Sequence, residues 1–156
     1  MKTILLVNND KAAISSLEAL LRRYRYEVIA TCDSSAAMVE IASEGRIDLV
    51  ITDHRMTGME ELAILKALRQ TRPDVPAIIL TGRGTLSSYL KAIGLGVTAY
   101  LENMGGNREL VRIIADTLGD SVEKEKDSTI TNTRCKAGHQ AGRTSYDRGY
   151  AEMVRS

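Results

Sequence analysis

This chain has few cysteines and no marked excess of either charge. Among its 156 residues there are two cysteines, Cys32 and Cys135, too few and too far apart to predict a disulfide framework or a zinc site. Lysine plus arginine number 21 and aspartate plus glutamate 20, so the formal net charge is +1. Both signs are interleaved along the chain, which argues against a surface for nucleic acid or for membranes.

Long apolar runs are also missing. The first run, from Ile4 to Val7, is shorter than the core of a secretory signal, and no run is long enough to cross a membrane. We therefore expect a soluble cytoplasmic protein with reduced thiols. With 44% hydrophobic residues the chain can bury one core. We expect a single domain over residues 1–120 and a polar, disordered tail or truncated linker over residues 121–156.

Short β-rich runs alternate with amphipathic helices in the first 120 residues. Ser34 or Ser35 is the predicted N-cap of the second helix and Asn107 that of the last. Gly45 is the predicted left-handed residue after the second helix. The expected strands are 3–7, 27–30, 49–52, 77–80 and 99–101, and the expected helices are 11–24, 35–44, 60–71, 85–93 and 108–118. The residues predicted to face the core are Ile14, Leu17, Leu21, Tyr24, Met38, Ile41, Ala42, Leu62, Leu65, Leu68, Leu110, Val111, Ile114 and Leu118.

Five apolar strands, each followed by a helix, predict a parallel sheet covered on both faces, which is the doubly wound α/β class. Ligands of such folds bind at the carboxyl ends of the strands, where the strand order reverses. The residues that follow the strands are expected to meet in one crevice, and they are Asn8, Asn9, Asp53, Thr81 and Asn103. A carboxylate at a strand tip suggests a phosphoryl or metal site, and here it has asparagines where such a site would want further negative charge.

Four segments together resemble the receiver domain of bacterial response regulators. They are residues 4–10, 48–59, 78–82 and 99–103, in the family's order and spacing. The likeness covers residues 1–120 and implies a flavodoxin-like sheet of strand order 2-1-3-4-5 with five helices. It also implies that Asp53 is the phospho-acceptor, that Thr81 contacts the phosphoryl group, and that Tyr100 is the aromatic residue that reorients with Thr81.

The magnesium site of the family is altered in this chain. Resemblance assigns its ligand positions to Asn8, Asn9, Asp53 and the backbone carbonyl of Arg55, so asparagines replace the usual acidic pair. Asp10 is expected to face away at the start of the first helix. One lost charge at ~4 Å costs about 4 kcal/mol at an effective dielectric near 20. We therefore expect weak Mg²⁺ binding, with the asparagine amides donating hydrogen bonds to the acceptor carboxylate instead.

Two further departures accompany the altered ligands. Asn103-Met104 takes the place of the usual Lys-Pro after the fifth strand, and Thr57 takes that of a turn proline. Loss of the lysine removes a cation that would offset the incoming phosphoryl charge. We expect a trans bond between Asn103 and Met104, because a non-prolyl cis bond costs ~2.5–4 kcal/mol.

The preferred function is an atypical, non-enzymatic receiver in two-component phosphorelay signalling, acting by protein interaction with weak or absent phosphorylation. A histidine kinase or another signalling protein is the expected partner. A homodimer is an option through the face of the fourth helix, fifth strand and last helix, where candidate contact residues are Arg83, Lys91, Glu102 and Arg112.

Two alternatives stay open to different degrees. The first is a conventional receiver that a histidine kinase phosphorylates on Asp53. The second is a phosphatase of the haloacid dehalogenase type, which needs a second aspartate two residues later, where this chain has Arg55. No nucleic-acid-binding output domain is recognisable after Asp120.

Overall fold

A five-stranded parallel sheet organises the protein, whose computed structural model describes residues 1–53, 62–102 and 106–121. The strand order is β2-β1-β3-β4-β5, as the resemblance implied. The inner strands β1, β3 and β4 are buried along their whole length, which is why their sequences are almost entirely aliphatic. The strands are β1 (Thr3–Val7), β2 (Glu27–Thr31), β3 (Leu49–Thr52), β4 (Ala77–Thr81) and β5 (Ala99–Glu102).

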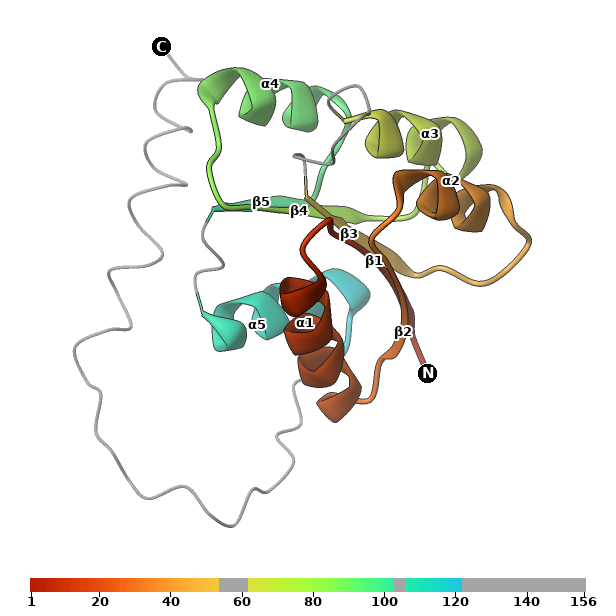
Figure 1. Ribbon diagram of the computed structural model, residues 1–156, viewed down its shortest axis with the longest axis vertical. Helices are drawn as coiled ribbons and strands as arrows, with labels where there is room; N and C mark the ends of the chain where they lie inside the picture. Colours follow the sequence, from red (N-terminus) through yellow and green to blue (C-terminus); the bar gives the residue numbers. More distant parts are fainter. Residues whose placement is uncertain (54–61, 103–105, 122–156) are drawn as a thin grey trace, which may run out of the picture. The chain divides into compact units, whose positions relative to one another are not determined.

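Helices cover both faces of the sheet (Figure 1). Helices α1 and α5 pack on one face, and α2, α3 and α4 on the other. This arrangement is the doubly wound fold predicted from the alternating pattern. The helices are α1 (Lys11–Arg23), α2 (Ser34–Ala42), α3 (Ala63–Thr71), α4 (Leu86–Gly94) and α5 (Asn107–Leu118). None in the described ranges is long and apolar enough to span a membrane.

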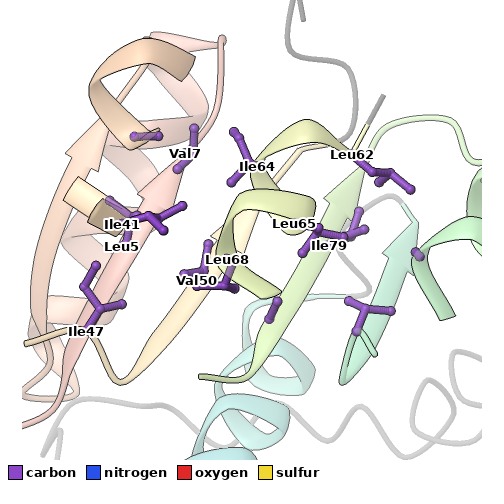
Figure 2. Close-up of a cluster of buried hydrophobic side chains, with 14 of the residues drawn as sticks. Leu5, Val7, Ile41, Ile47, Val50, Leu62, Ile64, Leu65, Leu68 and Ile79 are labelled. Atoms are coloured by element: carbon purple, nitrogen blue, oxygen red, sulfur yellow. The ribbon is translucent and has the colours of Figure 1, made fainter. Parts of the chain in front are cut away.

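Alternate strand residues build two hydrophobic cores. Leu5 and Val50 join Ile41 of α2 and Leu65 of α3 on one face, as Figure 2 shows. The neighbouring strand residues point to the other face, where they meet α1 and α5. The members of this second core include Ile4, Leu6, Ile51, Ile78, Leu17, Leu21, Leu110 and Ile114.

Several predicted helix boundaries were wrong. Asp33, and not a serine, is the N-cap of α2, because its carboxylate accepts the Ser35 N–H at 3.0 Å. The helix ends at Ala42, which is exposed and not directed inward as predicted. Its C-cap is Ser43, in an extended conformation. Gly45 does not have a positive φ, so the predicted left-handed residue was wrong. The remaining core predictions are buried or partly buried.

The starts of two other helices also differ from expectation. Gly106 is the N-cap of α5 at φ 98°, and Asn107 is the first helical residue. Helix α3 begins at Ala63, behind Leu62 at φ 66°, although the pattern predicted its start near residue 60. Residues 54–61 and 103–105, and the predicted tail after Ser121, lie outside the described residues.

Two arginines at the end of α3 connect neighbouring helices. The guanidinium of Arg72 donates to the carbonyls of Ile41, Ser43 and Gly45, at and after the end of α2. On the other side Arg69 donates to Leu95, the C-cap of α4, at 2.8 Å. These bonds satisfy carbonyls that a helix end leaves unpaired.

Candidate functional site

The predicted site residues of β1, β3 and β4 lie at the carboxyl ends of these neighbouring strands. Asp53 follows β3, and its N–H donates to the Val7 carbonyl at 3.2 Å, so the tips of β3 and β1 are adjacent. Asn8 follows β1, and Thr81 is the last residue of β4, which pairs with β3 on its other side. The backbone therefore brings these residues from distant parts of the chain to neighbouring strand ends.

Polar side chains in the loop after β1 accept hydrogen bonds from nearby backbone N–H groups. The Asn8 Oδ1 accepts the Asp10 N–H at 2.8 Å, which is the bond of an Asx turn. Asp10 in turn is the N-cap of α1, because its Oδ1 accepts the N–H groups of Ala12 and Ala13 at 2.9 and 3.3 Å. Asp10 thus begins the helix, as expected.

The predicted ligand side chains within the described residues differ in burial. Asp53 is half-buried, Asn8 is half-buried and Asn9 is exposed. Within the described ranges there is no group of three or more histidine, cysteine, aspartate or glutamate side chains that could hold a metal ion. Two predicted site residues, Arg55 and Asn103, lie outside those ranges.

Thr81 is buried at the end of β4, with 3% of its surface exposed. Its Oγ1 accepts the N–H of Arg83 at 3.2 Å and so fixes the first turn of the loop that leads to α4. A threonine hydroxyl has one proton and two lone pairs, so accepting this bond leaves its proton for a ligand.

Tyr100 lies in β5, beside β4, and points toward α4. Tyr100 is 8% exposed, and its ring makes an edge-to-face contact with that of Tyr89, the two centroids 5.6 Å apart. Its hydroxyl is 3.1 Å from Ser88 Oγ. Gly84, in the loop after β4, and Ser88, in α4, both lie close to Tyr100, and the sequence analysis did not predict a role for either. Spacing Thr85-x-x-Ser88 hints at a capping pair, but no local signal predicts its contact with Tyr100.

The predicted interaction face of α4, β5 and α5 is partly exposed. Arg83 and Lys91 are exposed, whereas Glu102 and Arg112 are half-buried. Among the described residues, Glu102 Oε2 and Arg112 Nε are buried atoms without a hydrogen-bond partner. Two large apolar side chains of α4 are also exposed, Leu90 at 44% and Ile93 at 46%.

The comparison with known families matches this geometry. A family model described as response regulator receiver domain matches residues 4–115. The chain belongs to the response regulator receiver family. Its receiver domain is thus the kind of domain that two-component response regulators use, and the predicted resemblance is confirmed.

Curated relatives share the receiver over part of their length. The transcriptional regulatory protein CpxR of Escherichia coli is 34% identical over 132 residues, which are 85% of this chain and 56% of CpxR. The transcriptional regulatory protein GlrR of Escherichia coli is 28% identical over 134 residues, 83% of this chain and 30% of GlrR. The chain therefore spans between about a third and just over half the length of these relatives.

Solved receiver structures have the same fold. A CheY-like receiver domain protein from Methanospirillum hungatei JF-1 is 26% identical, with a TM-score of 0.73, and the match covers 76% of this chain and 94% of that one. A receiver domain protein from Clostridium thermocellum is 25% identical, with a TM-score of 0.71, over 76% of this chain and 95% of that one.

Proposed function

We propose that this receiver acts in two-component signalling as an interaction module, with weak or absent Mg²⁺-dependent phosphorylation at Asp53. The observation that carries the proposal is the chemistry of the loop after β1. Where a charged ligand pair is needed, the chain has Asn8 and Asn9, and the oxygen of Asn8 already accepts the Asp10 N–H. We infer a signalling role rather than an enzymatic one.

The donor set does not fit a tightly bound magnesium ion. Mg²⁺ prefers carboxylate oxygens in an octahedral shell and gives up its water reluctantly. The carboxylate of Asp10 is engaged at the N-terminus of α1, which leaves Asp53 as the only acidic side chain among the assigned ligand positions. Each missing charge at ~4 Å is worth about 4 kcal/mol at an effective dielectric near 20, so Mg²⁺ affinity falls by orders of magnitude.

Residue roles follow from position in the family pattern. Asp53 holds the position of the acceptor and Thr81 that of the hydroxyl that contacts a phosphoryl group. Asn103 stands where a lysine cation is usual, and the resemblance assigns the remaining ligand position to the backbone carbonyl of Arg55. The amide groups of Asn8 and Asn9 serve as donors toward the Asp53 carboxylate in place of a metal.

Partners are recognised through the face of α4, β5 and α5. Exposed Leu90 and Ile93 on α4 support this assignment, since neighbouring exposed apolar side chains are typical of interaction sites. The occupant is a histidine kinase or another signalling protein, or a second copy of this chain that pairs through the same face.

Exposure to a small-molecule phosphodonor tests the proposal. The full chain is incubated with acetyl phosphate and Mg²⁺ and measured by intact mass, with Asp53→Ala as the matched control. We expect no stoichiometric phosphoryl adduct in either protein. An adduct on the unaltered chain that disappears in Asp53→Ala would establish the conventional receiver instead, a function favoured by the retention of Asp53 and Thr81 at neighbouring strand ends.

A further inference from the structure

The N-terminal end of α4 is held by two side-chain hydroxyls. Thr85 is the N-cap, and its Oγ1 accepts the Ser88 N–H at 3.1 Å. In return Ser88 Oγ accepts the Thr85 N–H at 3.1 Å, which completes a reciprocal capping box. Ser88 is fully buried, so the geometry of this cap is set by groups inside the protein.

Tyr100 adds a third hydroxyl to this cap. The Ser88 hydroxyl has a single proton, and it can donate that proton to the Thr85 carbonyl at 3.1 Å. The Tyr100 hydroxyl, 3.1 Å from Ser88 Oγ, then supplies the proton of their shared bond. A residue of β5 is thereby bonded to the first turn of α4, twelve positions earlier in the chain.

Gly84 makes the space that Tyr100 occupies. A Cβ added at Gly84 would lie 2.8 Å from the Tyr100 hydroxyl oxygen and 2.9 Å from its Cε1, closer than carbon atoms tolerate. Gly84 has no positive φ, so close approach rather than backbone conformation requires a glycine here. Gly82, in the same loop, has open space where its Cβ would stand.

We propose that Gly84, Ser88 and Tyr100 form a lock that holds the Tyr100 ring inward and keeps the start of α4 in one conformation, whatever the state of Asp53. Tyr100 then does not reorient with Thr81, in contrast to the switching role that the resemblance implies. Turning the ring outward breaks its bond to Ser88, separates it from Tyr89 and opens a cavity in the core. Each lost hydrogen bond alone shifts such an equilibrium by roughly twofold to tenfold. The lock extends the proposed function, on which it rests, because it presents Leu90 and Ile93 of α4 permanently.

The lock is tested by NMR on the full chain with ¹³C-labelled tyrosine rings. Tyr100→Phe assigns the Tyr100 signal among the six tyrosines of the sequence. We expect one Tyr100 ring signal, without relaxation dispersion from a second conformation, in the protein as it stands. In Gly84→Ala we expect that signal and the Ser88 amide to shift or broaden, while Gly82→Ala, the matched control, leaves both unchanged.

Ser88→Ala is the second variant and removes the shared hydroxyl without crowding the ring. We expect exchange of the Tyr100 ring in it even if Gly84→Ala fails to fold, as circular dichroism would reveal. Exchange of the ring in the unaltered protein, or an unchanged Tyr100 signal in folded Gly84→Ala and Ser88→Ala, overturns the lock.

Adding acetyl phosphate and Mg²⁺ separates the lock from the proposed function. A phosphoryl adduct with an unchanged Tyr100 signal defeats the proposed function and leaves the lock standing. An adduct that moves the Tyr100 signal in the unaltered chain, but not in Asp53→Ala, defeats both. Ring exchange without an adduct defeats the lock alone.

Discussion

Single residues in the loop after β1 have local tasks that limit what they can bind. Asn8 closes a turn and Asp10 caps α1, both through short bonds to nearby N–H groups. The sequence sufficed to place Asp53 and Thr81 at strand tips, because strands end where apolar runs end. It could not give the Asn8 to Asp10 bond, since an asparagine can equally accept, donate or point into solvent.

Substitutions of Asp10 test its role as the N-cap of α1. We expect Asp10→Ala to lower the free energy of unfolding by about 0.5–2 kcal/mol, since two N–H groups of α1 lose their acceptor. Asp10→Asn keeps a capping oxygen and should lose clearly less. Urea unfolding of both variants is the measurement, and equal losses in the two would contradict the capping role.

Tyr26 makes stability sensitive to alkaline pH. Burial, the charge of Asp120 and a hydrogen bond to that carboxylate raise the pKa of Tyr26 from 10.0 to about 12. A pKa that is higher in the folded protein gives stabilisation that is complete below pH 10 and is lost as the pH rises toward 12.

We therefore expect the free energy of unfolding to fall between pH 10 and about 12, and to fall less steeply in Tyr26→Phe. Denaturant unfolding of both proteins at a series of pH values gives the two slopes. The loss of the hydrogen bond alone lowers stability equally at every lower pH, so only the slope is diagnostic. Identical slopes would refute the role of Tyr26.

Whole elements followed the sequence more closely than their ends did. The strands were predicted within one residue, because runs such as 49–51 have no polar position that would suit a helix surface. Helix starts were missed where several residues could serve as the cap, as with Asp33 before Ser34 and Gly106 before Asn107. Which of these becomes the cap depends on backbone dihedral angles that tertiary packing sets.

Two arginines at the end of α3 hold neighbouring segments together, and the sequence pattern did not predict these contacts. Arg72 donates to three carbonyls at the end of α2, and Arg69 to carbonyls at the end of α4 and in the loop before β4. Each pairs a planar fork of donors with acceptors from separate segments, a task for which lysine has the wrong shape.

We expect Arg69→Lys and Arg72→Lys each to lower the free energy of unfolding by about 1–3 kcal/mol. Hydrogen exchange should rise at the end of α4 in Arg69→Lys and at the end of α2 in Arg72→Lys. Arg108→Lys, at an exposed position of α5, is the control and should stay within about 0.5 kcal/mol. Exchange rising equally in both regions in either variant would argue against separate anchoring.

At the scale of the molecule, substitutions of the exposed apolar side chains of α4 test whether two copies of the domain form a dimer through this face. If two copies pair through the face of α4, β5 and α5, Leu90→Glu and Ile93→Glu should each weaken the dimer about tenfold or more. Val39→Glu on α2 is the matched control, because Val39 is also an exposed apolar residue, at 68% exposure, and α2 is a different helix of the same layer. Sedimentation over a range of concentrations measures all three, and equal weakening by Val39→Glu would exclude this face.

The charge deficit at Asp53 is the central claim, and a Mg²⁺ titration followed by amide chemical shifts tests it most directly. The unaltered chain is compared with the double variant Asn8→Asp, Asn9→Asp, which restores two carboxylates beside Asp53. We predict shifts near Asp53 that do not saturate in the unaltered chain, and binding at least ~100-fold tighter in the double variant. Tight, saturable binding by the unaltered chain, equal to that of the double variant, would contradict the account.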